Sequence, residues 1–282
     1  MSNESKQIMR ATGLLIIETI NSNPNGDPDR ESDPRQRPDN RGEISPVSFK
    51  RKLRDLVEDK QGPVWNTLSS NLSLDPSRFD ILESRQTALK EIRDLGEADF
   101  INRYWDGRVF GNTELEKGRK VPVKTGVVQF GLGVSVAPIR VERMTTTNPP
   151  VQGDKSGGMA PLGYRVVEHG IYCMPFFVNP SAAHKSGCTA KDIELLLALI
   201  PHAYAHSRSY VRTNVEVLHA WYLEHKSPLG SCSDFKLIDA LSPKKNGQTE
   251  TASKNRSEYD IPQELPQELK AKLGTVKDLV EF

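Results

Sequence analysis

The chain has 282 residues, of which 36% are hydrophobic and 27% charged, and its formal net charge is +1. This length and apolar content are enough for a large core, in one domain with an insertion or in two domains. The near-zero charge excludes a globally basic nucleic-acid binder. Any such function must therefore come from a local cluster of cations.

The cysteines and the spread of apolar residues indicate the compartment. The three cysteines, Cys173, Cys188 and Cys232, are odd in number and widely spaced, which favours reduced thiols over a disulfide framework or a zinc site. The chain has no apolar run of about 18 residues, as a membrane-spanning helix needs. Its polar N-terminus lacks a signal-peptide core. We therefore expect a cytoplasmic protein without a membrane partner.

The N-terminal part predicts a strand, a polar loop and a basic helix. Residues 12–20 are rich in Leu and Ile, which is typical of a strand. Residues 22–43 contain too many Pro, Asp, Asn and Arg residues for a regular element, so we expect a loop. Residues 46–58 predict a helix with Ser45 as its N-cap and Pro46 at the first helical position, where its missing N–H costs nothing.

The rest of the chain predicts alternating strands and helices. We expect a helical stretch at 86–95, then strands at 120–144 and 165–178 that are separated by a long loop at 145–163. A helix at 190–206, a strand at 214–223 and a mobile polar linker at 242–256 follow. This order favours an α+β fold in which helices back one antiparallel sheet, as in a ferredoxin-like or RRM-like core.

The basic helix carries the strongest local charge signal. Four of the five residues from Lys50 to Arg54 are basic. At about 100° per residue, Lys50 and Arg54 share one flank of the apolar stripe, Arg51 lies beside them, and Lys52 lies toward the other flank. Because a helix N-terminus also attracts anions, this helix start predicts a phosphate-binding surface. A solvated basic face is the alternative.

Several segments between residues 12 and 240 carry a family resemblance. They are Asn23-x-Asn25-x-Asp27 after the first strand, Ile44-Ser45-x-x-Ser48-Phe49-Lys50-Arg51-x-Leu53-Arg54, Asp106-Gly107-Arg108-Val109-Phe110-Gly111, Gly126-Val127-Val128-Gln129-Phe130-Gly131 and, less specifically, Ser207 to Arg212. Val127 stands where proline is common. Together they resemble the backbone subunit of CRISPR Cascade complexes, of the RAMP superfamily, and most closely its type I-C variant.

The resemblance implies a domain plan and a function. It implies an RRM-like palm at 12–60 and 120–240, a finger insertion at 61–119 and a long thumb loop at 140–165, followed by a polar loop and C-terminal segment at 242–282. The chain would be a non-catalytic subunit without a cofactor that multimerises along guide RNA (crRNA). Its partners would be copies of itself, other Cascade subunits and a target DNA strand paired with the guide.

The candidate contact residues follow from the helix and from the resemblance. Phosphate contacts are expected from Lys50, Arg51 and Arg54, and neutral hydrogen bonds to phosphate or sugar from Asn23, Asn25, Ser45 and Ser48. Arg208 and Arg212 are a second contact set, or else plain surface arginines. The resemblance implies a base-displacing wedge at the thumb, for which Met144 is the candidate. Such contacts position RNA without reading its sequence, and base pairing then selects the target.

Two other functions remain open. Asp27, Asp29 and Asp33 lie in the loop where an Asp of related type III backbone subunits helps to cleave RNA, and carboxylates there could hold a divalent ion. Turn formation beside Pro and Gly is the plainer role. A generic single-strand RNA-binding module would instead stack bases on aromatic residues such as Tyr104 and Trp105.

Metal chemistry has one further candidate. His202 and His206 have the spacing of helical metal ligands but lack the Glu of H-E-x-x-H, so we expect no metal site there.

Overall fold

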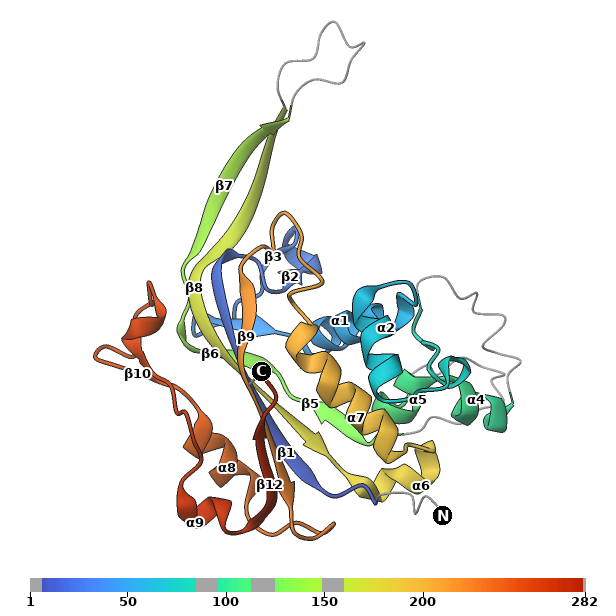
Figure 1. The fold of residues 1–282 in the computed structure, drawn as a ribbon. Coiled ribbons are helices and arrows are strands. Elements are labelled where there is room, and N and C mark those ends of the chain that lie inside the picture. Colours follow the sequence, from blue (N-terminus) through green and yellow to red (C-terminus); the bar gives the residue numbers. More distant parts are fainter. Residues whose placement is uncertain (1–6, 85–95, 113–124, 149–159, 281–282) are drawn as a thin grey trace, which may run out of the picture.

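The computed structural model describes residues 7–84, 96–112, 125–148 and 160–280. In this part of the chain an eight-stranded sheet forms the centre, helices pack against it, and a two-stranded ribbon projects from one end (Figure 1). Every strand pair in the sheet is antiparallel. The predicted antiparallel sheet with packed helices is thus confirmed.

The strands lie in the order β12-β9-β1-β8-β6-β4, and β5 and β7 also pair with β8. Their bounds are β1 Ala11–Ser22, β4 Arg41–Ile44, β5 Val128–Phe130, β6 Gly133–Pro138, β7 Val141–Asn148, β8 Ala160–Val178, β9 Val215–His225 and β12 Leu273–Asp278; two small hairpins lie outside the sheet, β2 Gly26–Asp27 with β3 Asp33–Pro34, and β10 Lys244–Lys245 with β11 Tyr259–Asp260.

The helices are mostly short. The α-helices are α1 Pro46–Glu58, α2 Pro63–Asn71, α4 Glu97–Arg103, α5 Trp105–Phe110, α6 Ala183–Ser186, α7 Ala190–Leu199, α8 Asp234–Leu241 and α9 Gln267–Lys270; the 3-10 turns are η1 Pro28–Arg30, η2 Pro76–Arg78, η3 Pro180–Ala182, η4 Ile200–His202 and η5 Arg256–Glu258. The helix predicted at 190–206 therefore ends earlier, because Pro201 and the following turn break it. The helical stretch predicted at 86–95 lies outside the described residues.

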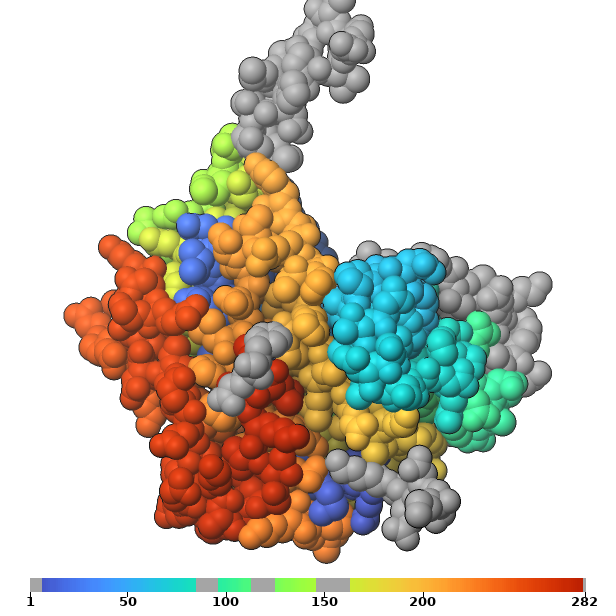
Figure 2. Space-filling view, viewed as in Figure 1, coloured from blue at the N-terminus to red at the C-terminus, as the bar shows by residue number. Residues whose placement is uncertain are grey.

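Strand β1 is apolar on both faces because both faces of the sheet are covered. Leu15 and Ile17 enter the larger core, which α1, α5 and α7 close. Leu14 and Ile16 enter a second core beneath α8 and α9. In the space-filling view the C-terminal segment (red) and α2 (cyan) lie on opposite sides of the molecule (Figure 2).

The C-terminal segment differs from the predicted mobile linker. Strand β12 joins the sheet beside β9. Lys245 is buried and donates to the carbonyl oxygens of Gln248 (2.6 Å) and Thr251 (2.9 Å), which hold the loop closed. The buried carboxylate of Glu18 pairs with Arg256 and so ties the segment to β1. These polar residues fold because they find partners within the loop and, through Arg256, on the sheet.

The strand predicted at 120–144 is divided. Its described part contains β5, β6 and the start of β7, and each break lets the chain change its pairing partner. The loop predicted at 145–163 is partly strand, since β7 runs to Asn148 and β8 begins at Ala160, and together they form the projecting ribbon (Figure 1).

Two of the segments that carry the resemblance are structural. The carboxylate of Asp106 accepts from the backbone N–H of Leu82 (2.6 Å) and lies 2.8 Å from Nε of Arg54, while Arg108 forms a buried ion pair of 2.6 Å with Asp192 on α7. Gly126 packs on this segment so closely that a Cβ would lie 2.1 Å from the carbonyl carbon of Phe110. These contacts join α1, α5, α7 and β5.

Candidate nucleic-acid interface

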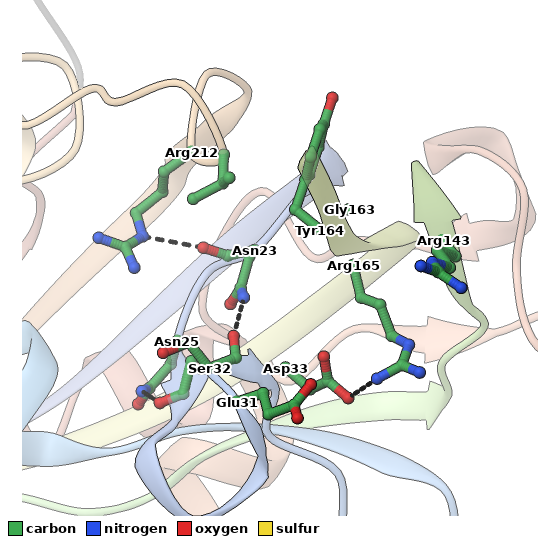
Figure 3. Close-up of a pocket in the computed structure, with 12 residues that line it drawn as sticks. Asn23, Asn25, Glu31, Ser32, Asp33, Arg143, Gly163, Tyr164, Arg165 and Arg212 are labelled. Carbon is green, nitrogen blue, oxygen red and sulfur yellow. Dashed lines mark hydrogen bonds and ion pairs between the residues drawn. The ribbon is translucent and has the colours of Figure 1, made fainter. Parts of the chain in front are cut away.

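A cleft of about 520 Å³ lies where the ribbon leaves the sheet (Figure 3). The end of β1, the β2–β3 hairpin, the base of β7 and β8, and the loop before β9 all contribute to it; its lining residues are Asn23, Asn25, Gly26, Glu31, Ser32, Asp33, Arg143, Gly163, Tyr164, Arg165, Val211 and Arg212. Sequence reasoning named Asn23, Asn25 and Arg212, and the fold brings these three together.

The asparagines shape the wall of the cleft. Asn23 donates from Nδ2 to the carbonyl oxygen of Ser32 (2.7 Å). Asn25 donates to the carbonyl oxygen of Gly26 (2.9 Å) and accepts from the backbone N–H of Ser45 (2.7 Å), which fixes the start of α1. The side chains of Asn23 and Asn25 are thus engaged in holding the loop.

The helix start forms as the sequence predicts. Oγ of Ser45 accepts from the backbone N–H of Ser48 at 3.2 Å, which is the predicted N-cap. This cap uses the Ser45 hydroxyl, and Ser48 is half-buried beside it.

Three arginines supply the positive charge of the cleft. Arg212 donates from Nε to the backbone oxygen of Asn23 (2.8 Å). Arg143 and Arg165 lie directly opposite each other in the β7–β8 register, and Arg165 pairs with Asp33. Like charges at opposed positions of a sheet are unfavourable, so an anion in the cleft beside the two guanidinium groups would relieve their repulsion.

Lys52 of α1 lies near Arg212 but does not line the cleft, and it is only 5% exposed. Its Nζ lies 3.3 Å from Oγ of Ser207 and 5.0 Å from the ring centre of Tyr204. Burial, together with the neighbouring charge of Arg212, lowers the pKa of Lys52 to about 8. Lys52 lies on the flank of the helix opposite to the flank that the sequence favoured.

Aromatic and apolar side chains border the arginines. The rings of Tyr164 and Tyr210 meet edge to face at 5.2 Å, and Tyr210 is 61% exposed. Met144, the predicted wedge, lies opposite Tyr164 in the ribbon and is exposed. Arginines beside accessible aromatic rings are typical of single-strand nucleic-acid sites, because cations hold phosphates and rings stack on bases.

The three cations first expected to hold phosphate have other partners. Arg54 is 4% exposed and pairs with Asp106 and Glu83, so its predicted surface role is wrong. Arg51 pairs with Asp55 (3.1 Å) and donates to the backbone oxygen of Glu83 (2.6 Å).

Lys50, the third of these cations, is half-buried. Its Nζ lies 5.1 Å from the ring centre of Phe110, and burial lowers its pKa. This flank of α1 faces the body of the protein, because α5 packs against it.

The cleft is not lined by four other candidate residues named from the sequence, Arg208, Tyr104, Trp105 and Asp27. Arg208 is exposed and does not line the cleft. Tyr104 and Trp105 are 2% and 0% exposed, so they cannot stack bases as the single-strand alternative requires. Asp27 accepts from the backbone N–H of Asp29 (3.2 Å), the turn role expected of such residues.

The described residues offer neither a clustered metal site nor a membrane-spanning helix. They contain no group of three or more His, Cys, Asp or Glu side chains placed to hold a metal ion. None of their helices is long and apolar enough to cross a membrane.

Comparison with known families identifies the chain. The family model for CRISPR-associated protein Cas7 matches residues 9–264. The chain therefore belongs to the Cas7 family.

The individual matching proteins share little sequence identity with this chain. The CRISPR-associated protein Cas7 of Haloferax volcanii is 26% identical over 211 residues, which cover 66% of this chain and 62% of that protein, so the chain spans less than two thirds of its relative. A chain of a CRISPR RNA-guided surveillance complex in a pre-nicking state has a TM-score of 0.47 at 16% identity, covering 76% of this chain and 75% of that one. A second such complex gives 0.41 at 16% identity, covering 84% and 78%.

Proposed function

We propose that this Cas7 family member is a non-catalytic, cytoplasmic backbone subunit of a type I surveillance complex, of the type I-C kind, which multimerises along guide RNA. The observation that carries the proposal is the family match over residues 9–264. The arginine-lined cleft supplies the chemistry, since Arg143, Arg165 and Arg212 can neutralise backbone phosphates without reading bases.

The strand order supports an RRM-like palm. In chain order, β1, α1, β6, β8, α7 and β9 give the spatial order β9-β1-β8-β6, which is the arrangement of a ferredoxin-like split βαβ unit. We assign residues 12–60 and 120–240 to this palm, 61–119 to the finger and 140–165 to the thumb, with 242–282 as a C-terminal addition. In this assignment the guide lies across the base of the thumb, because the C-terminal segment packs on one sheet face and helices on the other.

The partners follow from the same assignment. A thumb that projects from the palm can reach a neighbouring copy, and the guide then pairs with a target DNA strand. Other Cascade subunits would cap the resulting filament. Asp33 is paired with Arg165 and Asp27 with a backbone N–H, so neither is arranged as a free metal ligand. RNA incubated with the protein and Mg²⁺ should therefore stay intact.

Charge reversal tests the proposal. Arg143→Glu combined with Arg212→Glu should abolish stable binding of single-stranded RNA in a filter-binding titration, without a change in the thermal unfolding midpoint. Lys236→Glu with Lys270→Glu makes the same charge change at exposed positions of α8 and α9, and it should bind RNA like the parent. Equal loss in both double variants, or full binding by the arginine variant, would place the RNA elsewhere.

A further inference from the structure

The β2–β3 hairpin, residues 26–34, brings negative charge into the positive cleft. It carries Glu31 and Asp33, which line the same space as Arg143, Arg165 and Arg212 (Figure 3). We call residues 26–34 the acidic hairpin. Carboxylates inside a phosphate-binding cleft oppose RNA binding, so their presence there requires an explanation.

The acidic hairpin engages two groups that face the cleft. The carboxylate of Asp33 pairs with the guanidinium of Arg165, and the carbonyl oxygen of Ser32 accepts from Nδ2 of Asn23 at 2.7 Å. A carboxylate presents two oxygens to a guanidinium much as a phosphate does. The hairpin therefore satisfies the Arg165 cation in the absence of RNA.

The hairpin is held in an unfavourable backbone conformation. Glu31 and Ser32 have φ values of 50° and 64°, in the left-handed region that non-glycine residues rarely adopt. Gly26 is needed opposite them, because a Cβ there would lie 2.8 Å from the carbonyl oxygen of Ser32. Strain of this kind persists only where surrounding contacts maintain it. Here they are the β2–β3 pairing, the bond from Ser32 N–H to the carbonyl oxygen of Asp27 (2.9 Å) and the bond from Asn23 to Ser32.

We propose that Asp33 occupies the position of a guide-RNA phosphate on Arg165 in the free protein, and that RNA displaces it on binding. This inference rests on the proposed function. The exchange is easy for a polyanion, because an ion pair in which Arg165 is 45% and Asp33 24% exposed is weak. Asp33 would thus keep isolated small anions off Arg165 while admitting a strand that makes several contacts at once.

A double-mutant cycle on single-stranded RNA tests this displacement. Asp33→Asn should tighten binding about two- to fivefold, the effect of removing a competing surface ion pair. The slope of log affinity against log salt should not change, because the number of phosphates held is the same. Arg165→Gln should weaken binding and flatten that slope by about 0.7. In the Arg165→Gln background, Asp33→Asn should keep only the small effect of removing one negative charge from the cleft, because the ion pair is already gone.

Glu31→Gln is the matched control. It removes the same charge from the same cleft, but Glu31 forms no ion pair with a residue that the structure describes. Its effect should be smaller than that of Asp33→Asn and should persist without Arg165. Weaker binding by Asp33→Asn, or equal effects of the two variants, would overturn the displacement. A parent protein that binds no RNA would instead refute the proposed function.

Discussion

Replacement of Arg54 by Met distinguishes a buried structural cation from a phosphate ligand. The guanidinium lies 2.8 Å from Asp106 and 3.1 Å from Glu83, and the side chains of Arg54 and Asp106 are 4% and 1% exposed. Without Arg54, the charge of Asp106 stays buried and loses its main partner. Removal of one partner of a buried ion pair costs about 3–5 kcal/mol of folding free energy.

The loss should be visible in thermal unfolding. For a chain of this size, about 3–5 kcal/mol lowers the unfolding midpoint by roughly 6–20 °C. Arg103→Met is the control, because Arg103 pairs with Asp80 at a side chain that is 54% exposed, and this change should cost under about 1 kcal/mol. Addition of Asp106→Asn to Arg54→Met should restore part of the stability, since an amide oxygen can still accept from Leu82 N–H.

RNA binding provides the second measurement on Arg54→Met. Below its unfolding transition, the variant should keep the salt dependence of the parent, because Arg54 contacts no phosphate. An unchanged midpoint together with a salt slope flattened by about 0.7 would show that Arg54 holds a phosphate and has no structural role.

Two further predictions concern titration and assembly. Burial raises the pKa of Glu18, but hydrogen bonds from His169 and Arg256 outweigh it and bring the pKa to about 2. Its stabilisation is therefore complete above pH 4.5 and lost between 4.5 and about 2, so Glu18→Gln should flatten that part of the stability profile; an unchanged profile contradicts this. Replacement of residues 146–162 by a short Gly/Ser connection should preserve the unfolding midpoint but prevent multimers on RNA in light scattering, and full-length multimers would exclude the thumb assignment.

The sequence predicts a helix or strand well where residues adjacent in the chain determine its structure. Ser45 and Pro46 predict the start of α1, and the apolar run of residues 12–20 predicts β1; both elements form as expected. Strand β12 was missed because its six residues are stabilised by pairing with β9, far away in the chain. The segment before it was expected to be mobile because its polar residues gain their partners only in the folded protein.

Only part of the candidate site was predicted, because its contacts join residues that lie far apart in the chain. The helical period places Arg54 and Lys52 on different flanks of α1, but it cannot show that Asp106 packs against the Arg54 flank in the folded protein. Arg143 and Arg165 carry a signal that could have been found. They are equally distant from Asp154, so a hairpin centred there places them opposite each other, as the register of β7 and β8 does.

Photo-cross-linking of the protein to single-stranded RNA containing 4-thiouridine locates the RNA on the chain and so tests whether it binds in the arginine-lined cleft. We expect cross-links in the tryptic peptides that contain Tyr164 and Tyr210, the half-buried and the exposed ring beside Arg165 and Arg212. These cross-links should disappear in the Arg143→Glu, Arg212→Glu variant. Cross-links confined to α2, α8 or the C-terminal segment, and unchanged in that variant, would contradict RNA binding in this cleft.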